Sequence, residues 1–250
     1  MKRPALPINQ AAHGSVSKLV ENSYAVSFAP SGLAPDSFCW EGCRLIKVCY
    51  AQRQESYRKN SVGVAMARRA AAGPLEVLRS AALGMPRSFV WLRLFVNGSA
   101  PMRSDFDTVA DWRLWRREFR QFVEMGLASG AQCHIPLESA RKVRAYRSIL
   151  QGLPVVVRQS LQVNSPASIV RAAGPSSWVV VAPENRLHRG GVKRSERERN
   201  YLHALEVAKW LRSQGLSVVV CPYDRTGRQC GSCTACASAL VDVVLYPFHG

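Results

Sequence analysis

Cysteine is the residue type whose spacing points most clearly to chemistry in this chain. Seven of the eight cysteines form two clusters. The first is Cys39-x3-Cys43-x5-Cys49, and the second is Cys221-x8-Cys230-x2-Cys233-x2-Cys236. Thiolates spaced this closely can converge on one metal centre, because ligation needs only a short loop that brings the sulfurs together. The N-terminus shows no apolar run of signal-peptide length, so we expect reduced thiols and metal binding rather than disulfides.

The spacing of the second cluster favours iron–sulfur over zinc. Its overlapping C-x2-C-x2-C triplet is typical of ferredoxin-type runs, and four thiolates would saturate a [4Fe–4S] cluster. Zinc is the alternative occupant, because four cysteines with paired C-x2-C elements also form structural zinc sites. Three thiolates at the first cluster would leave one iron open to a substrate or cofactor. Cys133 is a candidate fourth ligand, and its alternative role is that of a small buried hydrophobe.

Six short apolar runs predict strands, and segments with helical spacing lie between them. The runs are Tyr24–Phe28, Ser88–Val96, Ala131–His134, Val155–Gln159, Trp178–Val181 and Ser217–Cys221. Strict alternation of strand and helix predicts parallel strands joined by right-handed crossovers. The predicted fold class is therefore α/β, either a partial (βα)6 TIM-like barrel or an open parallel sheet. In both, ligands gather at the C-terminal ends of the strands.

Both cysteine-rich loops fall at that end of the predicted fold. Cys39 follows the first strand, and Cys221 ends the sixth. If these two strands border one opening, the two clusters lie near each other. Other polar residues at strand ends could face a ligand, or serve as caps, surface charges or ion-pair partners. They are Arg93, Asp105, Asp107, His134, Glu138, Arg158, Gln159 and Glu184.

Two helices are clear from their apolar stripes. In the first, the stripe consists of Trp112, Trp115, Phe119 and Phe122. The second runs from about Ser195 to Gln214, and its apolar face consists of Tyr201, Ala204, Leu205, Ala208 and Leu211. We expect both helices to pack on the sheet.

The chain is long enough for one α/β domain with a substantial core, since it has 250 residues of which 47% are hydrophobic. We assign residues 1–23 to an N-terminal extension and 24–221 to the α/β partial-barrel domain. Residues 222–250 form a C-terminal cysteine-rich segment packed on that domain. No stretch approaches the roughly 20 apolar residues of a membrane span, so we expect a cytoplasmic protein with no membrane partner.

The charge balance favours nucleic acid as a partner. Lys and Arg number 34 against 17 Asp and Glu, which gives a formal net charge of +17. Such an excess attracts polyanions, although a basic solvated surface without a specific ligand is the alternative. The candidate nucleic-acid-binding residues are Arg113, Arg116, Arg117, Arg120, Arg186, Arg189, Lys193, Arg194 and Arg197.

A strand, then a three-cysteine loop, then further βα units is similar to the radical S-adenosylmethionine enzymes. This resemblance implies that Cys39, Cys43 and Cys49 hold a site-differentiated [4Fe–4S] cluster. It also implies that Asn97 and Gly98, which stand where the family has its glycine-rich segment, approach S-adenosylmethionine. The four C-terminal cysteines would then hold an auxiliary cluster. The chain departs from the family pattern in its second cysteine gap, which is x5 instead of x2.

A closer resemblance covers most of the chain. Cys49-Tyr50-Ala51, Val96-Asn97-Gly98 and Cys221-Pro222 occur in the order found in the phage gene product eighty-eight family. The resemblance implies a phage, prophage or plasmid origin and no established reaction.

The leading hypothesis is an iron–sulfur protein with one or two clusters, a radical S-adenosylmethionine-like enzyme acting on or near nucleic acid. The alternative is a non-enzymatic nucleic-acid-binding or regulatory protein with structural or redox-sensing iron–sulfur or zinc sites.

Overall fold

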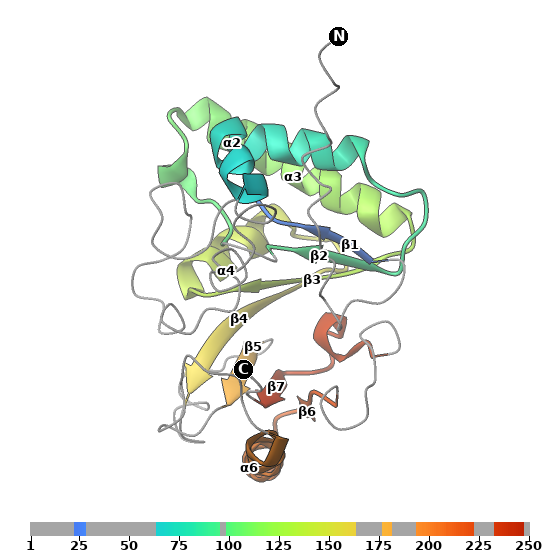
Figure 1. The fold of residues 1–250 in the computed structure, drawn as a ribbon, viewed down its shortest axis with the longest axis vertical. Coiled ribbons are helices and arrows are strands. Elements are labelled where there is room, and N and C mark those ends of the chain that lie inside the picture. Colours follow the sequence, from blue (N-terminus) through green and yellow to red (C-terminus); the bar gives the residue numbers. More distant parts are fainter. Residues whose placement is uncertain are drawn as a thin grey trace.

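The fold is built on a seven-stranded sheet in which every neighbouring pair of strands is parallel (Figure 1). The computed structural model describes residues 23–28, 64–95, 99–163, 177–181, 194–222 and 233–247. The strands are β1 (Ser23–Val26), β2 (Trp91–Leu94), β3 (Gln132–Leu137), β4 (Val156–Val163), β5 (Ser177–Val181), β6 (Val218–Val220) and β7 (Val243–Pro247). Their order in the sheet is β1-β2-β3-β4-β5-β7-β6. The predicted α/β class with parallel strands is confirmed.

Four long helices and two short 3-10 turns connect the described strands. The helices are α2 (Val64–Leu83), α3 (Val109–Ala128), α4 (Ala140–Ile149) and α6 (Arg194–Ser213), and the turns are η3 (Arg103–Asp105) and η6 (Ala235–Ala237). The start of α3 is set by Thr108, whose hydroxyl accepts a hydrogen bond from the Asp111 N–H at 3.1 Å. Ser139 caps α4 in the same way, because its hydroxyl accepts a hydrogen bond from the main-chain N–H of Lys142 at 3.3 Å. None of the helices in the described ranges is long and apolar enough to cross a bilayer.

The predicted apolar stripes of α3 and α6 pack on the sheet. Trp115, Phe119 and Phe122 are buried in a core shared by α2, α3, α4 and the first four strands. On α6 the buried residues include Ala204, Ala208 and Leu211, which pack on β6 and β7 in a second core. The prediction for α6 is wrong at one position: Leu205 is 37% exposed.

All four long helices cover the same face of the sheet. In β4, Val157 belongs to the core under α2, α3 and α4, while Leu161 packs against the core under α6. Side chains an even number of residues apart on a strand project to the same face of the sheet, so Val157 and Leu161 mark one face. We call this the helix face. Figure 1 shows α2, α3 and α4 beside β1, β2 and β3, with α6 beside β6 and β7. The opposite face carries η6, because Arg158, adjacent to Val157, bonds to it; we call it the η6 face.

The sheet differs from the prediction in its last strand. β7 lies inside the segment 222–250 and pairs with both β5 and β6. The C-terminal cysteine-rich segment therefore contributes an interior strand to the sheet instead of only packing on it. Among the described strands, β1 and β6 stand at opposite ends of the strand order.

Candidate functional site

The first cysteine cluster and several other predicted site residues lie outside the described residues. This holds for Cys39, Cys43, Cys49, Asn97, Gly98, Arg186, Arg189, Lys193 and Cys230, and for the side chain of Arg194. The described candidates are Cys133, Cys221, Cys233 and Cys236, and the arginines of α3 together with Arg197 of α6. The four described cysteines are all free thiols.

Cys221 lies at the carboxyl end of β6, where its N–H donates to the Leu245 carbonyl at 2.8 Å. Val220 and Leu245 are the last paired positions of β6 and β7, so Cys221 and Tyr246 follow them side by side. Since Val220 and Leu245 pack in the core under α6, strand alternation places Cys221 and Tyr246 on the η6 face.

Cys236 comes to the same place from a different part of the chain. It lies in η6, and its Sγ is 2.9 Å from the Tyr246 hydroxyl oxygen. Two of the four C-terminal cysteines, Cys221 and Cys236, therefore neighbour the same tyrosine on the η6 face. The convergence of the four thiols on one metal stays a prediction, since Cys230 lies outside the described residues.

Arg158 of β4 holds the segment around η6 in place. The residue is fully buried, and its guanidinium donates five hydrogen bonds to main-chain carbonyl oxygens. Nε bonds to Cys236 at 2.9 Å, Nη1 to Val241 at 3.0 Å and Asp242 at 3.3 Å, and Nη2 to Ala235 at 3.2 Å and Ser238 at 2.9 Å. A guanidinium has five N–H donors in a planar fork. The five carbonyls, two within η6 and three after it, thus match the number of donors that Arg158 offers.

The same guanidinium puts a positive charge beside Cys236 and Tyr246. Burial lowers the pKa of Arg158, while Cys236, Tyr246 and Asp242 act in the opposite direction. Sulfur and phenol groups near a cation are favoured in their anionic forms. The η6 face therefore offers an electropositive setting for a sulfur ligand.

His134 lies on the same face, one strand away from Arg158. Its ring packs at 5.2 Å from that of Trp91, and it is 5% exposed. Burial lowers the pKa of His134 to about 3, and the charges of Arg93 and Arg158 act in the same direction. The imidazole is consequently neutral at physiological pH.

Cys133, the candidate fourth ligand, lies on the other side of the sheet. It is 1% exposed and belongs to the core under α2, α3 and α4. Burial raises the pKa of its thiol to about 12, so it stays protonated near neutral pH. This environment favours the alternative role, a small hydrophobe in the core, over that of a thiolate ligand.

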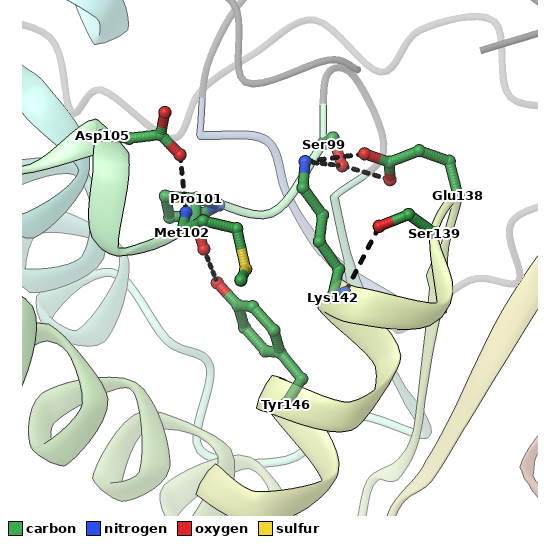
Figure 2. A network of polar contacts seen from close by, with 8 residues as sticks. All are labelled: Ser99, Pro101, Met102, Asp105, Glu138, Ser139, Lys142 and Tyr146. Carbon is green, nitrogen blue, oxygen red and sulfur yellow. Dashed lines mark hydrogen bonds and ion pairs between the residues drawn. The ribbon is translucent and has the colours of Figure 1, made fainter. Parts of the chain in front are cut away.

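A buried polar network follows Asn97 and Gly98 in the chain, at the carboxyl ends of β2 and β3 (Figure 2). The Ser99 hydroxyl donates to Glu138 Oε2 and accepts from Lys142 Nζ at 2.9 Å. Lys142 Nζ also lies 2.6 Å from Glu138 Oε1, and the lysine is 6% exposed. The network thus fixes the first described residue after the Asn97-Gly98 pair.

Tyr146 ties the same stretch of chain to the helices. Its hydroxyl donates to the Pro101 carbonyl at 2.8 Å (Figure 2). The same hydroxyl accepts a hydrogen bond from Trp115 Nε1 at 3.3 Å. Burial raises the pKa of Tyr146 well above its ordinary value, so it remains a donor at all physiological pH values. The chain from Ser99 to Pro101 is therefore anchored by α4 at two points.

Sequence reasoning names Glu138 and Arg158 only as strand-end residues and overlooks Ser99 and Tyr246. The Glu138–Lys142 pair has a local signal, because a glutamate four residues before a lysine is a favourable helical spacing. Lys142 stands among exposed arginines in the sequence of α4, whereas its own side chain is buried.

The arginines proposed for nucleic acid divide into exposed and internally bonded ones. Arg113, Arg116 and Arg117 are exposed on α3, and Arg197 is exposed on α6. Arg120 instead bonds to the carbonyls at the end of α4, with Nη1 3.1 Å from Ile149 and 2.8 Å from Gln151. α3 and α6 lie at opposite ends of the molecule (Figure 1), so these exposed arginines form separate patches.

Within the part of the chain that the structure describes, no three His, Cys, Asp or Glu side chains gather as a metal-binding group. That part contains three of the four C-terminal cysteines and none of the first cluster. No protein-family model matches the chain, and neither a curated protein nor a solved structure matches it.

Proposed function

We propose that this chain is an iron–sulfur protein whose C-terminal cysteines bind a cluster at the carboxyl ends of β6 and β7. The ligands are Cys221, Cys230, Cys233 and Cys236. The observation that carries the proposal is the position of Cys221 and Cys236 beside Tyr246 on the η6 face. Residues far apart in the chain are brought together there by the pairing of β6 with β7.

The surroundings suit an anionic group. A cluster held by four thiolates carries net negative charge, and hydrogen bonds and nearby charge adjust its potential. The Arg158 guanidinium supplies positive charge at this position. Zinc is the alternative occupant of the same four thiols.

The second part of the proposal concerns the first cluster. Cys39, Cys43 and Cys49 would hold a site-differentiated [4Fe–4S] cluster on a partial barrel, with S-adenosylmethionine near Asn97 and Gly98. Its support is the resemblance to radical S-adenosylmethionine enzymes and to the phage gene product eighty-eight family. The Ser99 network adds support, because it fixes the chain immediately after Gly98. Helices on a single face of a parallel sheet are also what a partial barrel needs.

The test is metal analysis of protein purified without oxygen. We expect iron and acid-labile sulfide, and we expect Cys221→Ser and Cys236→Ser to lose the iron of the C-terminal site. Cys133→Ala is the matched control, since it removes a thiol from the core and should retain all the iron. Zinc in place of iron would refute the cluster, and protein that binds neither metal would refute the site.

A second assay tests the enzyme. Reduced, cluster-loaded protein is incubated with S-adenosylmethionine, and 5′-deoxyadenosine is measured. Its formation, and its loss in Cys39→Ser, would support the radical chemistry. No product from protein with its full iron content would favour the regulatory or binding alternative.

Nucleic-acid binding is the second candidate function, favoured by the exposure of Arg113, Arg116 and Arg117 on one helix of a chain with net charge +17. We expect affinity for DNA or RNA to fall steeply with salt. Replacing the three arginines by glutamine should reduce the slope of log affinity against log salt by roughly 0.9 for each phosphate of duplex DNA that the variant no longer neutralises. Lys209→Gln on α6, also exposed, is the control. Affinity that ignores salt would count against binding to phosphates.

A further inference from the structure

The arginines of α3 and α4 differ in whether they bond within the protein. Arg120 of α3 is held between the two helices, because its guanidinium donates to carbonyls at the end of α4. By contrast, four exposed arginines form no hydrogen bond or ion pair with any residue that the structure describes. They are Arg113 and Arg116 of α3 and Arg141 and Arg144 of α4. Their guanidinium groups are therefore available to an outside partner.

The helices α3 and α4 lie side by side and run in the same direction. Trp115 Nε1 of α3 lies 3.3 Å from the Tyr146 hydroxyl of α4. Further along both helices, Arg120 Nη1 lies 3.1 Å from the Ile149 carbonyl. A residue of α3 is therefore level with the residue of α4 that follows it by 29 to 31 positions.

The four free arginines lie on the outer sides of these two helices. Arg113 and Arg116 precede Arg120 by seven and four positions, so they share the side of α3 that is next to α4. Arg141 and Arg144 are three positions apart and lie on the side of α4 away from its buried residues. Because Arg113 is level with Arg144, the two rows form one surface, which we call the α3–α4 arginine surface.

The carboxylates on these helices are already engaged. Glu118 pairs with Arg79 of α2 at 2.8 Å, and Glu124 pairs with Arg120 at 2.9 Å. Asp111 is hydrogen-bonded at the start of α3. The sequence of α4 contains no acidic residue. No carboxylate of these two helices is therefore left to compensate the positive charge of the α3–α4 arginine surface.

We propose that the α3–α4 arginine surface binds the backbone phosphates of double-stranded nucleic acid, an inference that rests on the nucleic-acid part of the proposed function and extends it to α4. Guanidinium groups form paired hydrogen bonds with phosphate oxygens. The axes of packed helices are about 8–10 Å apart, and the minor groove of duplex DNA is about 6 Å wide. Two rows of arginines at such a separation suit the two strands that border a groove, whereas a single strand offers one line of phosphates.

The composition of the surface disfavours two other polyanions. Single strands are bound largely by stacking of bases on aromatic side chains. The ring of Trp112 instead packs against that of Phe106, with centroids 5.5 Å apart. Anionic membranes bind basic helices that also carry large apolar side chains. Apart from arginines, the exposed residues of α4 are only Ala140 and Ser148. The surface is thus suited to contacts with phosphates and not with bases or lipid chains.

The test removes the α4 row alone. The double variant Arg141→Gln with Arg144→Gln removes two exposed charges from the surface. The matched control, Arg68→Gln with Arg87→Gln, removes two exposed charges on α2 and just before β2, so both variants have the same net charge. Binding of full-length protein to a labelled DNA duplex, an RNA duplex and single-stranded DNA is measured by fluorescence anisotropy over a range of salt.

We expect the α4 variant to reduce the slope of log affinity against log salt by about 1.8, which is about 0.9 for each lost contact with a phosphate of duplex DNA. The control should keep the wild-type slope. A duplex, of DNA or RNA, should bind more tightly than single-stranded DNA of the same length. Urea unfolding of each variant checks that the fold is retained.

The outcomes separate this inference from the proposed function. Equal slopes for the α4 variant and the control, in protein that still binds nucleic acid, overturn the α3–α4 arginine surface and leave nucleic-acid binding in place. Single-stranded DNA bound as tightly as both duplexes, or anionic vesicles bound more tightly than either, overturns the choice of partner. No binding to any nucleic acid at low salt overturns the nucleic-acid function itself and this inference with it.

Discussion

Replacing Arg158 by leucine should detach the segment around η6 from β4 and cost several kcal/mol of stability. The substitution removes a fully buried guanidinium that satisfies five carbonyl oxygens. Leucine keeps part of the apolar volume and supplies no donor. The carbonyls must then find water or remain unpaired.

The magnitude follows from the number and setting of the bonds. At about 1 kcal/mol for each hydrogen bond, the five together give roughly 5 kcal/mol as an upper figure. The carbonyls of Ala235, Cys236 and Ser238 belong to half-exposed residues, so water can replace some of the missing donors. Removing the charge also relieves its desolvation cost. We therefore expect Arg158→Leu to lose about 3 kcal/mol, and Arg158→Lys, with three donors in place of five, about 2 kcal/mol.

The assay is urea unfolding followed by tryptophan fluorescence, combined with hydrogen exchange of native protein. The matched control is Arg147→Leu, which removes an exposed arginine whose Nη2 donates to the Val157 carbonyl at 3.2 Å, and should cost no more than about 1 kcal/mol. Exchange should rise in residues 235–247 well before it rises in α3. A loss below about 1 kcal/mol in Arg158→Leu, or lysine as stable as arginine, would refute the clamp.

Three further predictions concern other buried groups. Lys142→Met should cost about 3 kcal/mol because it leaves Glu138 charged and half-buried, and adding Glu138→Gln should recover part of that loss in a double-mutant cycle; losses that simply add would contradict a coupled pair. Gly126→Ala should lower the thermal midpoint, at a cost of about 1–3 kcal/mol, because its Cβ would stand 2.7 Å from Leu92 Cδ2; a gain in stability would mean that the leucine moves freely. Burial lowers the pKa of His134 from 6.5 to about 3, so between these pH values the unfolded chain binds more protons than the folded one. The stability that neutral His134 contributes is therefore fully present above pH 6.5 and is lost as the pH falls toward 3. His134→Gln should flatten the fall of unfolding free energy over that range, by up to ~1.4 kcal/mol per pH unit, and identical pH profiles would refute this.

Local patterns predict much of the scaffold because each strand and helix carries its own signal. The apolar stripe of Trp115, Phe119 and Phe122 identifies α3, since a period of 3.6 residues is a property of that segment alone. The strand runs are located for the same reason. Their ends are less accurate: β3 continues to Leu137 and β4 to Val163, where pairing with neighbouring strands extends them beyond their apolar runs.

Strand order is not a local property, and there the prediction falls short. Val243–Pro247 is an apolar run like the others, but assigning 222–250 to a cysteine-rich segment hides it. Its insertion between β5 and β6 depends on contacts between distant residues, which no spacing in the sequence encodes.

The candidate site is predictable in its residue types and not in its partners. The cysteine spacing identifies Cys221 and Cys236, and the structure places both beside Tyr246. The tyrosine and Arg158 are ordinary strand residues in the sequence, and their roles arise only when β4 and β7 bring them to η6. The same is true of Ser99 and Lys142, which meet although 43 positions separate them in the chain.

The place of β7 also bears on how the protein acquires its structure during synthesis. As the nascent chain leaves the ribosome, β6 appears before β7, yet among the described strands β7 is its sole pairing partner. Until residues 243–247 emerge, both β5 and β6 present main-chain groups that can pair with another chain. Completion of this half of the sheet is therefore a late event that depends on a distant pairing, and such events are slow and prone to misassembly. A chain whose synthesis stops between the two strands would lack the strand that joins β5 to β6.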